Sequence, residues 1–193
     1  MDFLELVKRS RSYRSFDPNR PIAMPQLRKL VELCRYTPSS VNLQVLRFRL
    51  CCTPEENALM LARTGWARLL KDQMQLPPPG HGPSAYVVIC AAGDADKARF
   101  RADAAIAAQT LLLGAADQGL GGCMIGNFNP DDIAQALKLP AGLTPLLVVA
   151  LGTPDEQIIL EDATPGGSTA YYRDAQGIHH VPKRTMEELI VAP

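Results

Sequence analysis

The stretch Ala102–Phe128 constrains the fold more than any other part of the chain. Asp103 is suited to cap a helix N-terminus, and the residues from Ala104 to Ala116 that follow it are apolar on nearly every side of a helix. A helix that is apolar all round is a buried one, and about a dozen residues are too few to span a membrane, which takes roughly 20. A chain of 193 residues rarely surrounds such a helix alone, so we expect a second subunit to cover part of it.

The end of this stretch predicts a sharp turn and then a short buried strand. Asp117–Gly119 ends the helix, and Leu120–Gly122 carries two glycines that favour a tight turn. Cys123–Ile125 is apolar and leads into Gly126–Phe128, where the chain becomes polar again.

The remaining pattern interleaves helices and strands. Helical spacing or capping residues predict helices over 2–9, 25–36, 65–76, 130–137 and 186–191, and another after the capping box of Thr53 and Glu56. Apolar runs and alternation predict strands over 45–52, 86–92 and 146–151, whereas 155–171 is rich in loop residues and 178–181 is extended. Three or four strands among such helices indicate an α/β or α+β fold in a single domain, residues 1–193.

Composition excludes some partners. Twenty basic and twenty acidic residues cancel, which argues against a general nucleic-acid or anionic-membrane binder. The first five residues include Asp2 and Glu5 where a signal peptide needs basic residues, and no run of 18 apolar residues occurs. We therefore expect a soluble, cytoplasmic protein.

The five cysteines are interpreted as small core residues in a reducing compartment. Cys51 and Cys52 are neighbours, which makes them an unlikely disulfide pair, and no C-x-x-C motif is present. Most of the cysteines lie in apolar helix or strand contexts.

Several standard sites can be set aside. Gly119 and Gly121 follow a helix rather than a strand, so they are not a dinucleotide fingerprint, and neither a phosphate-binding G-x-x-x-x-G-K-[ST] nor a G-x-S-x-G nucleophile motif occurs. His179 and His180 are adjacent and would point to opposite faces of a strand. No metal site and no histidine-based triad is therefore predicted.

Three polar clusters remain, and each has two interpretations. Arg11–Arg14 can bind a phosphate through two guanidiniums and a hydroxyl, or it is a solvated basic loop. Pro38–Gln44 is dense in side chains that donate and accept hydrogen bonds, or it merely forms a turn. Lys183–Arg184 adds positive charge to a site, or it starts an exposed helix.

Taken in order, these clusters resemble the nitroreductase family of FMN-dependent oxidoreductases. Arg11–Phe16 is similar to the family's R-S-x-R-x-F motif, and Pro38–Gln44 to its P-S-[SA]-x-N-x-Q turn. Asp103–Phe128 resembles the family's central helix, G-L-G turn and strand beneath the flavin, and Val181–Arg184 its basic C-terminal segment. Ser10 departs from the pattern, because the family often has an arginine there.

The resemblance implies an α+β fold with three layers, α/β/α, and a mostly antiparallel central sheet, in an intertwined homodimer with FMN at the interface. Carried over to this chain, Arg11 and Ser12 would hold the phosphate and ribityl chain with help from Lys183 and Arg184. Arg14 would approach the pyrimidine edge of the ring and tune its redox chemistry.

The remaining carried-over residues surround the flavin from two subunits. The partner would supply the turn residues Pro38, Ser39, Ser40, Asn42 and Gln44. Met124, Ile125 and Gly126 would lie against one face of the ring, with a backbone N–H near Gly126 bonded to flavin N5. No side chain is expected to act as catalytic acid or base, because the cofactor carries the chemistry.

The function that the resemblance implies is reduction of FMN by NADH or NADPH, followed by reoxidation by a small acceptor such as a nitroaromatic or quinone, with ping-pong kinetics at one pocket. A flavoenzyme of this fold with other chemistry, such as reductive dehalogenation or flavin modification, is an alternative. So is a non-enzymatic flavin-binding protein. If the central helix serves both the dimer and the cofactor, a polar substitution at Leu112 should cost both together.

Overall fold

The computed structural model describes residues 2–93 and 97–191. Its helices are α1 (Phe3–Arg9), α2 (Met24–Leu33), α3 (Pro54–Leu61), α4 (Lys97–Asp117), α5 (Pro130–Ala136) and α6 (Met186–Leu189). Its strands are β1 (Leu46–Cys51), β2 (Ala85–Ala92), β3 (Gly121–Ile125), β4 (Leu143–Gly152), β5 (Ile158–Asp162), β6 (Tyr172–Arg173) and β7 (His179–Lys183). Two 3-10 turns, η1 (Cys34–Tyr36) and η2 (Ser40–Asn42), follow α2.

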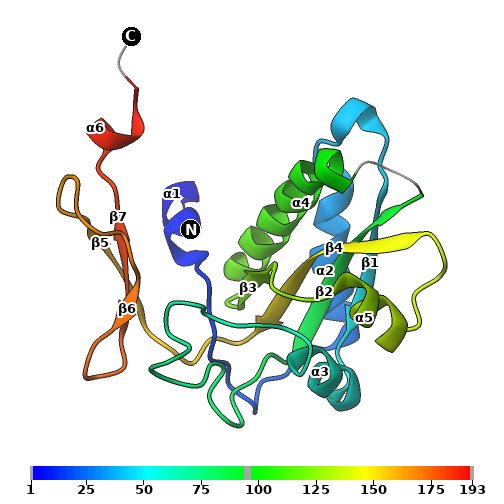
Figure 1. Ribbon diagram of the computed structural model, residues 1–193, viewed down its shortest axis with the longest axis horizontal. Coiled ribbons are helices and arrows are strands. Elements are labelled where there is room, and N and C mark those ends of the chain that lie inside the picture. Colours follow the sequence, from blue (N-terminus) through cyan, green and yellow to red (C-terminus); the bar gives the residue numbers. More distant parts are fainter. Residues whose placement is uncertain (1, 94–96, 192–193) are drawn as a thin grey trace.

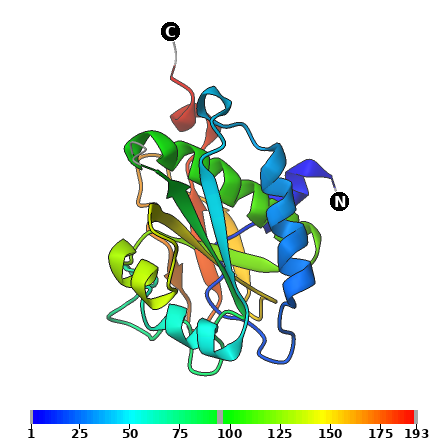
Figure 2. The same cartoon turned by 90° about the vertical axis from the view of Figure 1, so that its right-hand side faces the viewer.

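The central sheet has the order β1-β2-β4-β3, and each neighbouring pair is antiparallel. Helices α2 and α4 lie on one side of it and α3 and α5 on the other (Figures 1 and 2). Alternating side chains of β2 serve the two cores, because Val87 and Ile89 pack with α2 and α4 whereas Tyr86 and Val88 pack with Met60 and Ile133. The predicted three-layer α/β/α fold with a mostly antiparallel sheet is confirmed.

The glycine-rich turn before β3 brings that strand close to β4. Gly119 has φ +74°, a conformation that side chains disfavour, and the strand begins at Gly121, two residues earlier than predicted. A Cβ at Gly122 would lie 2.3 Å from the carbonyl oxygen of Ala150. Only glycine therefore permits the close approach that seats β3 at the edge of the sheet.

The capped helices follow their sequence signals. Thr53 and Glu56 form the predicted capping box at the start of α3, and Asn129 accepts from two backbone N–H groups at the start of α5.

Two predictions about helices were wrong. Residues 65–76 form turns instead of a helix, and Ala67 has φ +37°, which is incompatible with a continuous right-handed helix. Helix α4 begins at Lys97, so Asp103 lies inside it and is not its N-cap.

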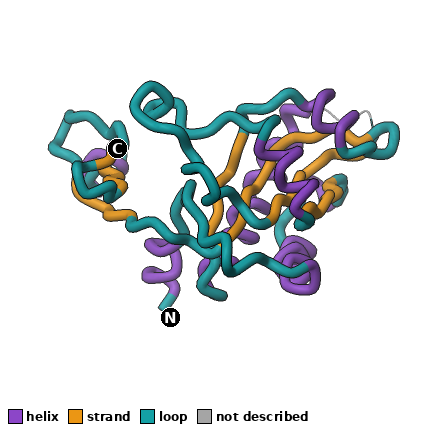
Figure 3. Tube along the Cα trace, turned by 90° about the horizontal axis from the view of Figure 1, so that it is seen from below, coloured by secondary structure: helices purple, strands orange, loops and turns teal. Residues whose placement is uncertain are grey.

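We call residues 155–191 the C-terminal arm. It holds a second sheet, β5-β7-β6, followed by α6, and it stands beside the central sheet rather than within it (Figures 1 and 3). The prediction of loop structure over 155–171 missed β5, which pairs in parallel with β7 about twenty residues later. Because the two strands are distant in sequence, their pairing produces no pattern within either segment that a sequence reading could detect. Helix α6 ends at Leu189, two residues before the predicted end.

One face of α4 is open in the single chain. Ala105, Ile106 and Gln109 are exposed there, while Leu112 is only 7% exposed and packs in the chain's own core. Leu112 is therefore a poor probe of a subunit contact, contrary to our expectation. Within residues 2–93 and 97–191, no helix is long and apolar enough to cross a membrane.

The cysteines occupy the core, as predicted, apart from the half-buried Cys52. Burial raises the pKa of Cys34 and Cys90 to about 11 and that of Cys51 to about 12, so these thiols stay protonated.

Candidate functional site

The Arg11–Arg14 segment lies alongside β3. Ser12 forms a parallel bridge with Gly122, and the backbone N–H of Tyr13 donates to the Gly122 carbonyl at 3.0 Å. Because β3 runs on toward Gly126, this pairing brings two clusters that are more than a hundred residues apart in sequence to one place.

A cavity of about 770 Å³ lies where these clusters meet. Arg14 and Tyr171 form one part of its wall, and the end of β3 with the following turn forms another, from Cys123 to Asn127. The non-helical segment after α3 closes the rest with Gly65, Trp66, Ala67, Arg68 and Lys71. Among the described residues, its lining includes three cationic side chains and no carboxylate.

A smaller cavity of about 200 Å³ adjoins it, and Arg14 and Tyr171 line both. Its other walls are Arg11, Ser12, Ile158, His179, Val181 and Lys183. In the part of the chain that the structure describes, this lining also lacks a carboxylate. Burial lowers the pKa of the Arg11 guanidinium, which means that water solvates its charge poorly.

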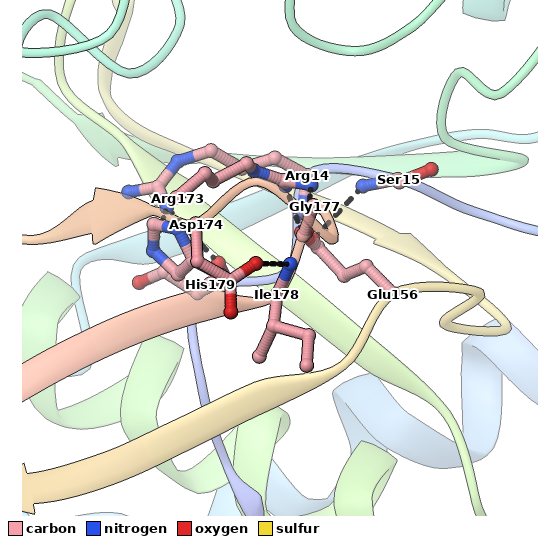
Figure 4. A network of polar contacts seen from close by, with 9 residues as sticks. Arg14, Ser15, Glu156, Arg173, Asp174, Gly177, Ile178 and His179 are labelled. Carbon is pink, nitrogen blue, oxygen red and sulfur yellow. Dashed lines mark hydrogen bonds and ion pairs between the residues drawn. The ribbon is translucent and has the colours of Figure 1, made fainter.

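Arg14 is held by the C-terminal arm (Figure 4). The arginine is 9% exposed, and its Nη1 donates to the Ser12 carbonyl at 3.2 Å. Glu156 accepts from the backbone N–H groups of Arg14 and Ser15, the latter at 3.1 Å, and pairs with Arg173 through its other oxygen. The residues that enclose Arg14 thus come from the other end of the chain.

The buried cluster around Arg14 has an unbalanced charge. Arg14 and Arg173 contribute two positive charges and Glu156 one negative charge, while His179 is neutral. No acceptor among the described residues reaches the Nε of Arg14 or of Arg173. Buried charges require partners, so this arrangement suits an anionic or strongly accepting ligand.

His179 and His180 point to opposite faces of β7, as expected for neighbours on a strand. His179 is 2% exposed, and its Nε2 lies 3.3 Å from Arg14 Nη1. His180 stacks on Tyr172 with 4.7 Å between ring centroids and bonds to Glu161 and Asp174. The bond to Asp174 is the main cause of the raised pKa of His180, and the two contacts join β7 to β5 and to the turn that precedes β7.

His179 predicts a pH dependence of stability. Burial, with Arg14, Arg173 and His180 nearby, lowers its pKa from 6.5 to about 4. Between those values the unfolded chain binds a proton that the folded chain does not, so this contribution is complete above about pH 6.5 and is lost as pH falls toward 4. Wild type should lose about 3 kcal/mol more unfolding free energy over this window than His179→Phe, measured by urea unfolding. Equal losses would contradict a neutral His179.

The Pro38–Gln44 turn is attached to α4 by Asp103. The buried carboxylate accepts from the hydroxyl of Ser39 at 3.0 Å and from the hydroxyl and N–H of Ser40 at 2.8 to 3.1 Å. Val41, Asn42 and Gln44 all have positive φ, and Val41 is 80% exposed. A β-branched residue in this conformation is a true outlier, typical of functional loops.

The structure brings together some of the predicted site residues and separates others. Arg11, Ser12, Arg14, Lys183 and the Met124–Gly126 group line the two adjoining cavities. The turn residues Pro38, Ser39, Asn42 and Gln44 line a different cavity of about 240 Å³, and Ser40 bonds to Asp103. Arg184 is not in the lining of either adjoining cavity and pairs instead with Glu188 at 3.0 Å.

Four functional candidates were missed by the sequence analysis: Glu156, Tyr171, Arg173 and His179. Glu156, Tyr171 and His179 contact Arg14 or its neighbour Ser15, some 140 to 165 residues away, and Arg173 joins the cluster through its ion pair with Glu156. One local signal was available. Asp174 and Gly177 occupy the first and last positions favoured in a type I turn, between two short segments rich in Tyr, Arg and His.

The chain is similar to several known proteins. Over 54 residues the chain is 39% identical to "Putative NAD(P)H nitroreductase YdgI" of Bacillus subtilis, a match that spans 28% of this chain and 26% of that protein. Protein DrgA of Synechocystis is 23% identical over 192 residues, covering 86% of this chain and 91% of that protein. The solved structure of an FMN-dependent nitroreductase from Clostridium difficile is 24% identical, with a TM-score of 0.65, and the match covers 80% of this chain and 89% of that one.

A family model matches most of the chain as well. Residues 7–153 match the model of the Nitroreductase family, and this range takes in three of the four sequence blocks on which the resemblance was based. The C-terminal arm, with its contribution to the Arg14 cluster, lies beyond the matched range. Since the match spans well over half of the 193 residues, the chain belongs to the nitroreductase family.

Proposed function

We propose that the chain is a homodimeric FMN-dependent oxidoreductase, in which NAD(P)H reduces the flavin and a small acceptor such as a nitroaromatic or quinone reoxidises it. The observation that carries the proposal is the buried Arg14 cluster, with its net positive charge and unpaired donors beside two adjoining cavities. Family membership supports it, as do the names of two relatives, one FMN-dependent and one termed an NAD(P)H nitroreductase.

The residues present fit FMN. The smaller cavity has Arg11, Lys183 and the Ser12 hydroxyl in its walls, and a phosphate would compensate the poorly solvated charge of Arg11. The larger cavity is bounded by Met124–Gly126 on one side and by Arg14 on another, which suits a flat ring with an accepting edge.

The chain contributes orientation and charge to this chemistry. When bound, FMN accepts a hydride from NAD(P)H and passes electrons to the acceptor. Arg14 would place a cation beside the part of the flavin that becomes negative on reduction. Because Arg14 is buried, water would screen this attraction only weakly. Trp66, Arg68 and Lys71 line the rest of the larger cavity, where nucleotide and acceptor would take turns in one place. Such sharing gives ping-pong kinetics.

A homodimer would complete the site. The open face of α4 offers Ala105 and Ile106 to a partner, and the arm exposes Met186, Leu189 and Ile190. The turn Pro38–Gln44, which lines a separate cavity in the single chain, would then reach the flavin of the other subunit. Two expectations stay predictions: residues 1–193 form one FMN-binding domain, and the protein is cytoplasmic.

The direct test is the absorption spectrum of the purified chain and a titration with FMN. We expect flavin absorption bands, tight binding of added FMN, and oxidation of NADH or NADPH when a quinone or nitroaromatic is present. Protein that is colourless, binds no FMN and oxidises neither nucleotide would refute the proposal.

Gly126→Ala should reduce FMN affinity about tenfold without destabilising the fold. A Cβ at this position meets nothing within 4 Å, so it would occupy cavity space rather than strain the chain. A tenfold loss corresponds to about 1.4 kcal/mol, a modest steric cost. FMN fluorescence titration and thermal unfolding would measure both properties.

Gly82→Ala is the matched control. Its added Cβ would make an ordinary contact at 3.5 Å with Leu61, away from both cavities, so FMN affinity should not change. Unchanged affinity in Gly126→Ala as well would show that the flavin does not approach this part of the turn.

A further inference from the structure

The guanidinium of Arg14 contacts two neighbouring rings of the C-terminal arm. Its Nη1 is 3.3 Å from His179 Nε2, and its central carbon is 5.0 Å from the centroid of the Tyr171 ring. The centroids of the two rings lie 5.3 Å apart, so the guanidinium and both rings form one cluster with two contacts to the arginine.

The contact with His179 determines where the imidazole proton lies. A guanidinium has only hydrogen-bond donors, so His179 Nε2 must be the acceptor. The proton of the neutral ring is then on Nδ1. A doubly protonated ring would lose its acceptor and would face Arg14, Arg173 and His180 together, with Lys183 lining the same small cavity.

We propose that His179 is a positioning residue for the flavin site, holding the Arg14 guanidinium where the two cavities join through the hydrogen bond that Nε2 accepts. This inference rests on the proposed FMN function. An unrestrained arginine has several flexible torsions and would have to be ordered when the ligand binds, which costs affinity. His179 removes that cost in advance.

Three features support this role over simple filling of the core. His179 is among the largest fully buried side chains yet has a polar contact with Arg14. Its buried Nδ1 has no partner among the described residues, which is a cost that an apolar ring filling the same space would not carry. The turn before β7 is itself fixed, because Asp174 accepts from the N–H of Ile178 (Figure 4) and from that of Gln176.

Two substitutions separate positioning from packing. His179→Phe keeps a ring of similar volume but has no acceptor, whereas His179→Gln can accept from Arg14 through its amide oxygen. His179→Phe should weaken FMN binding about tenfold, the usual effect of losing one hydrogen bond to a charged group, and should lower the flavin reduction potential. His179→Gln should restore most of both. Equal losses in the two variants would overturn the proposal, because a packing role does not distinguish them.

A double substitution tests whether His179 acts through Arg14. In an Arg14→Ala background, His179→Phe should cause no further loss of FMN affinity, since the group that it positions is gone. Additive losses would mean that His179 acts independently of Arg14 and would overturn the inference.

A third measurement needs no flavin. Long-range nitrogen–proton NMR of the full chain without FMN should show His179 with its proton on Nδ1, and Arg14→Ala should shift the ring toward a mixture of tautomers. A proton on Nε2 in the wild type would overturn the inference. If the wild type gave the expected tautomer but bound no FMN, the proposed function would fail while the Arg14–His179 contact stood.

Discussion

Replacing Arg14 by alanine is expected to weaken FMN binding about a hundredfold and to lower the reduction potential of the bound flavin. The affinity loss follows from removing one or two hydrogen bonds to a charged group, each contributing about 1.5–3 kcal/mol. The potential falls because the reduced cofactor carries more negative charge than the oxidised one, and a buried cation stabilises it. A difference of about 2 kcal/mol between the two redox states corresponds to about 40 mV for a two-electron couple.

Arg28→Ala is the control for this prediction. Arg28 is an exposed arginine of α2, so its loss changes the net charge equally but leaves both cavities intact. Fluorescence titration gives the affinity, and equilibration with a reference dye gives the potential. A potential that stays at the wild-type value in Arg14→Ala would show that Arg14 does not lie near the redox-active ring.

Ile106→Asp is expected to convert the dimer into monomers and to abolish FMN binding at micromolar cofactor. Ile106 is 39% exposed on the open face of α4, where we propose that the partner packs. Burying an unpaired carboxylate costs several kcal/mol, more than one apolar contact could offset. FMN is lost as well because the partner would supply Pro38–Gln44. Size-exclusion chromatography with light scattering would measure the mass.

Leu61→Asp provides a matched control, since Leu61 is 38% exposed but lies on α3, on the opposite side of the central sheet. It should remain dimeric and retain FMN. If Ile106→Asp also remained a dimer with full FMN affinity, α4 would not be the subunit interface. Leu112 cannot serve in this test, because a polar residue there would disrupt the chain's own core.

Periodicity predicted those parts of the fold whose side chains face one continuous environment. The run Tyr86–Ala92 predicted a strand covered on both faces, and β2 is central to the sheet. The apolar pattern predicted most of α4. The same pattern placed the start of α4 at Asp103, six residues too late. The partners of Asp103 are Ser39 and Ser40, about 64 residues away, and the sequence alone does not distinguish a buried aspartate inside a helix from one that caps it.

The site was predictable only in part, for the same reason. Arg11, Arg14 and Met124–Gly126 lie in motifs, so a resemblance could place them near one ligand. Glu156 and His179 lie outside the range that matches the family and acquire their roles through the fold alone. No composition or spacing rule joins a histidine to an arginine 165 positions earlier. The fourth block, Val181–Arg184, was the part of the resemblance that pointed toward the arm, and of its two basic residues Lys183 lines the smaller cavity.

The enclosure of Arg14 by the C-terminal arm also bears on how the protein assembles. Contacts over the longest sequence separations are the slowest to form, because closing a long loop costs entropy before any contact can repay it. The bonds from Glu156 and His179 to Arg14 and Ser15 span 141 to 165 residues, and β7 follows all four strands of the central sheet in the chain. We therefore expect the central sheet to fold first and the capacity to bind cofactor to appear as a separate, later kinetic phase.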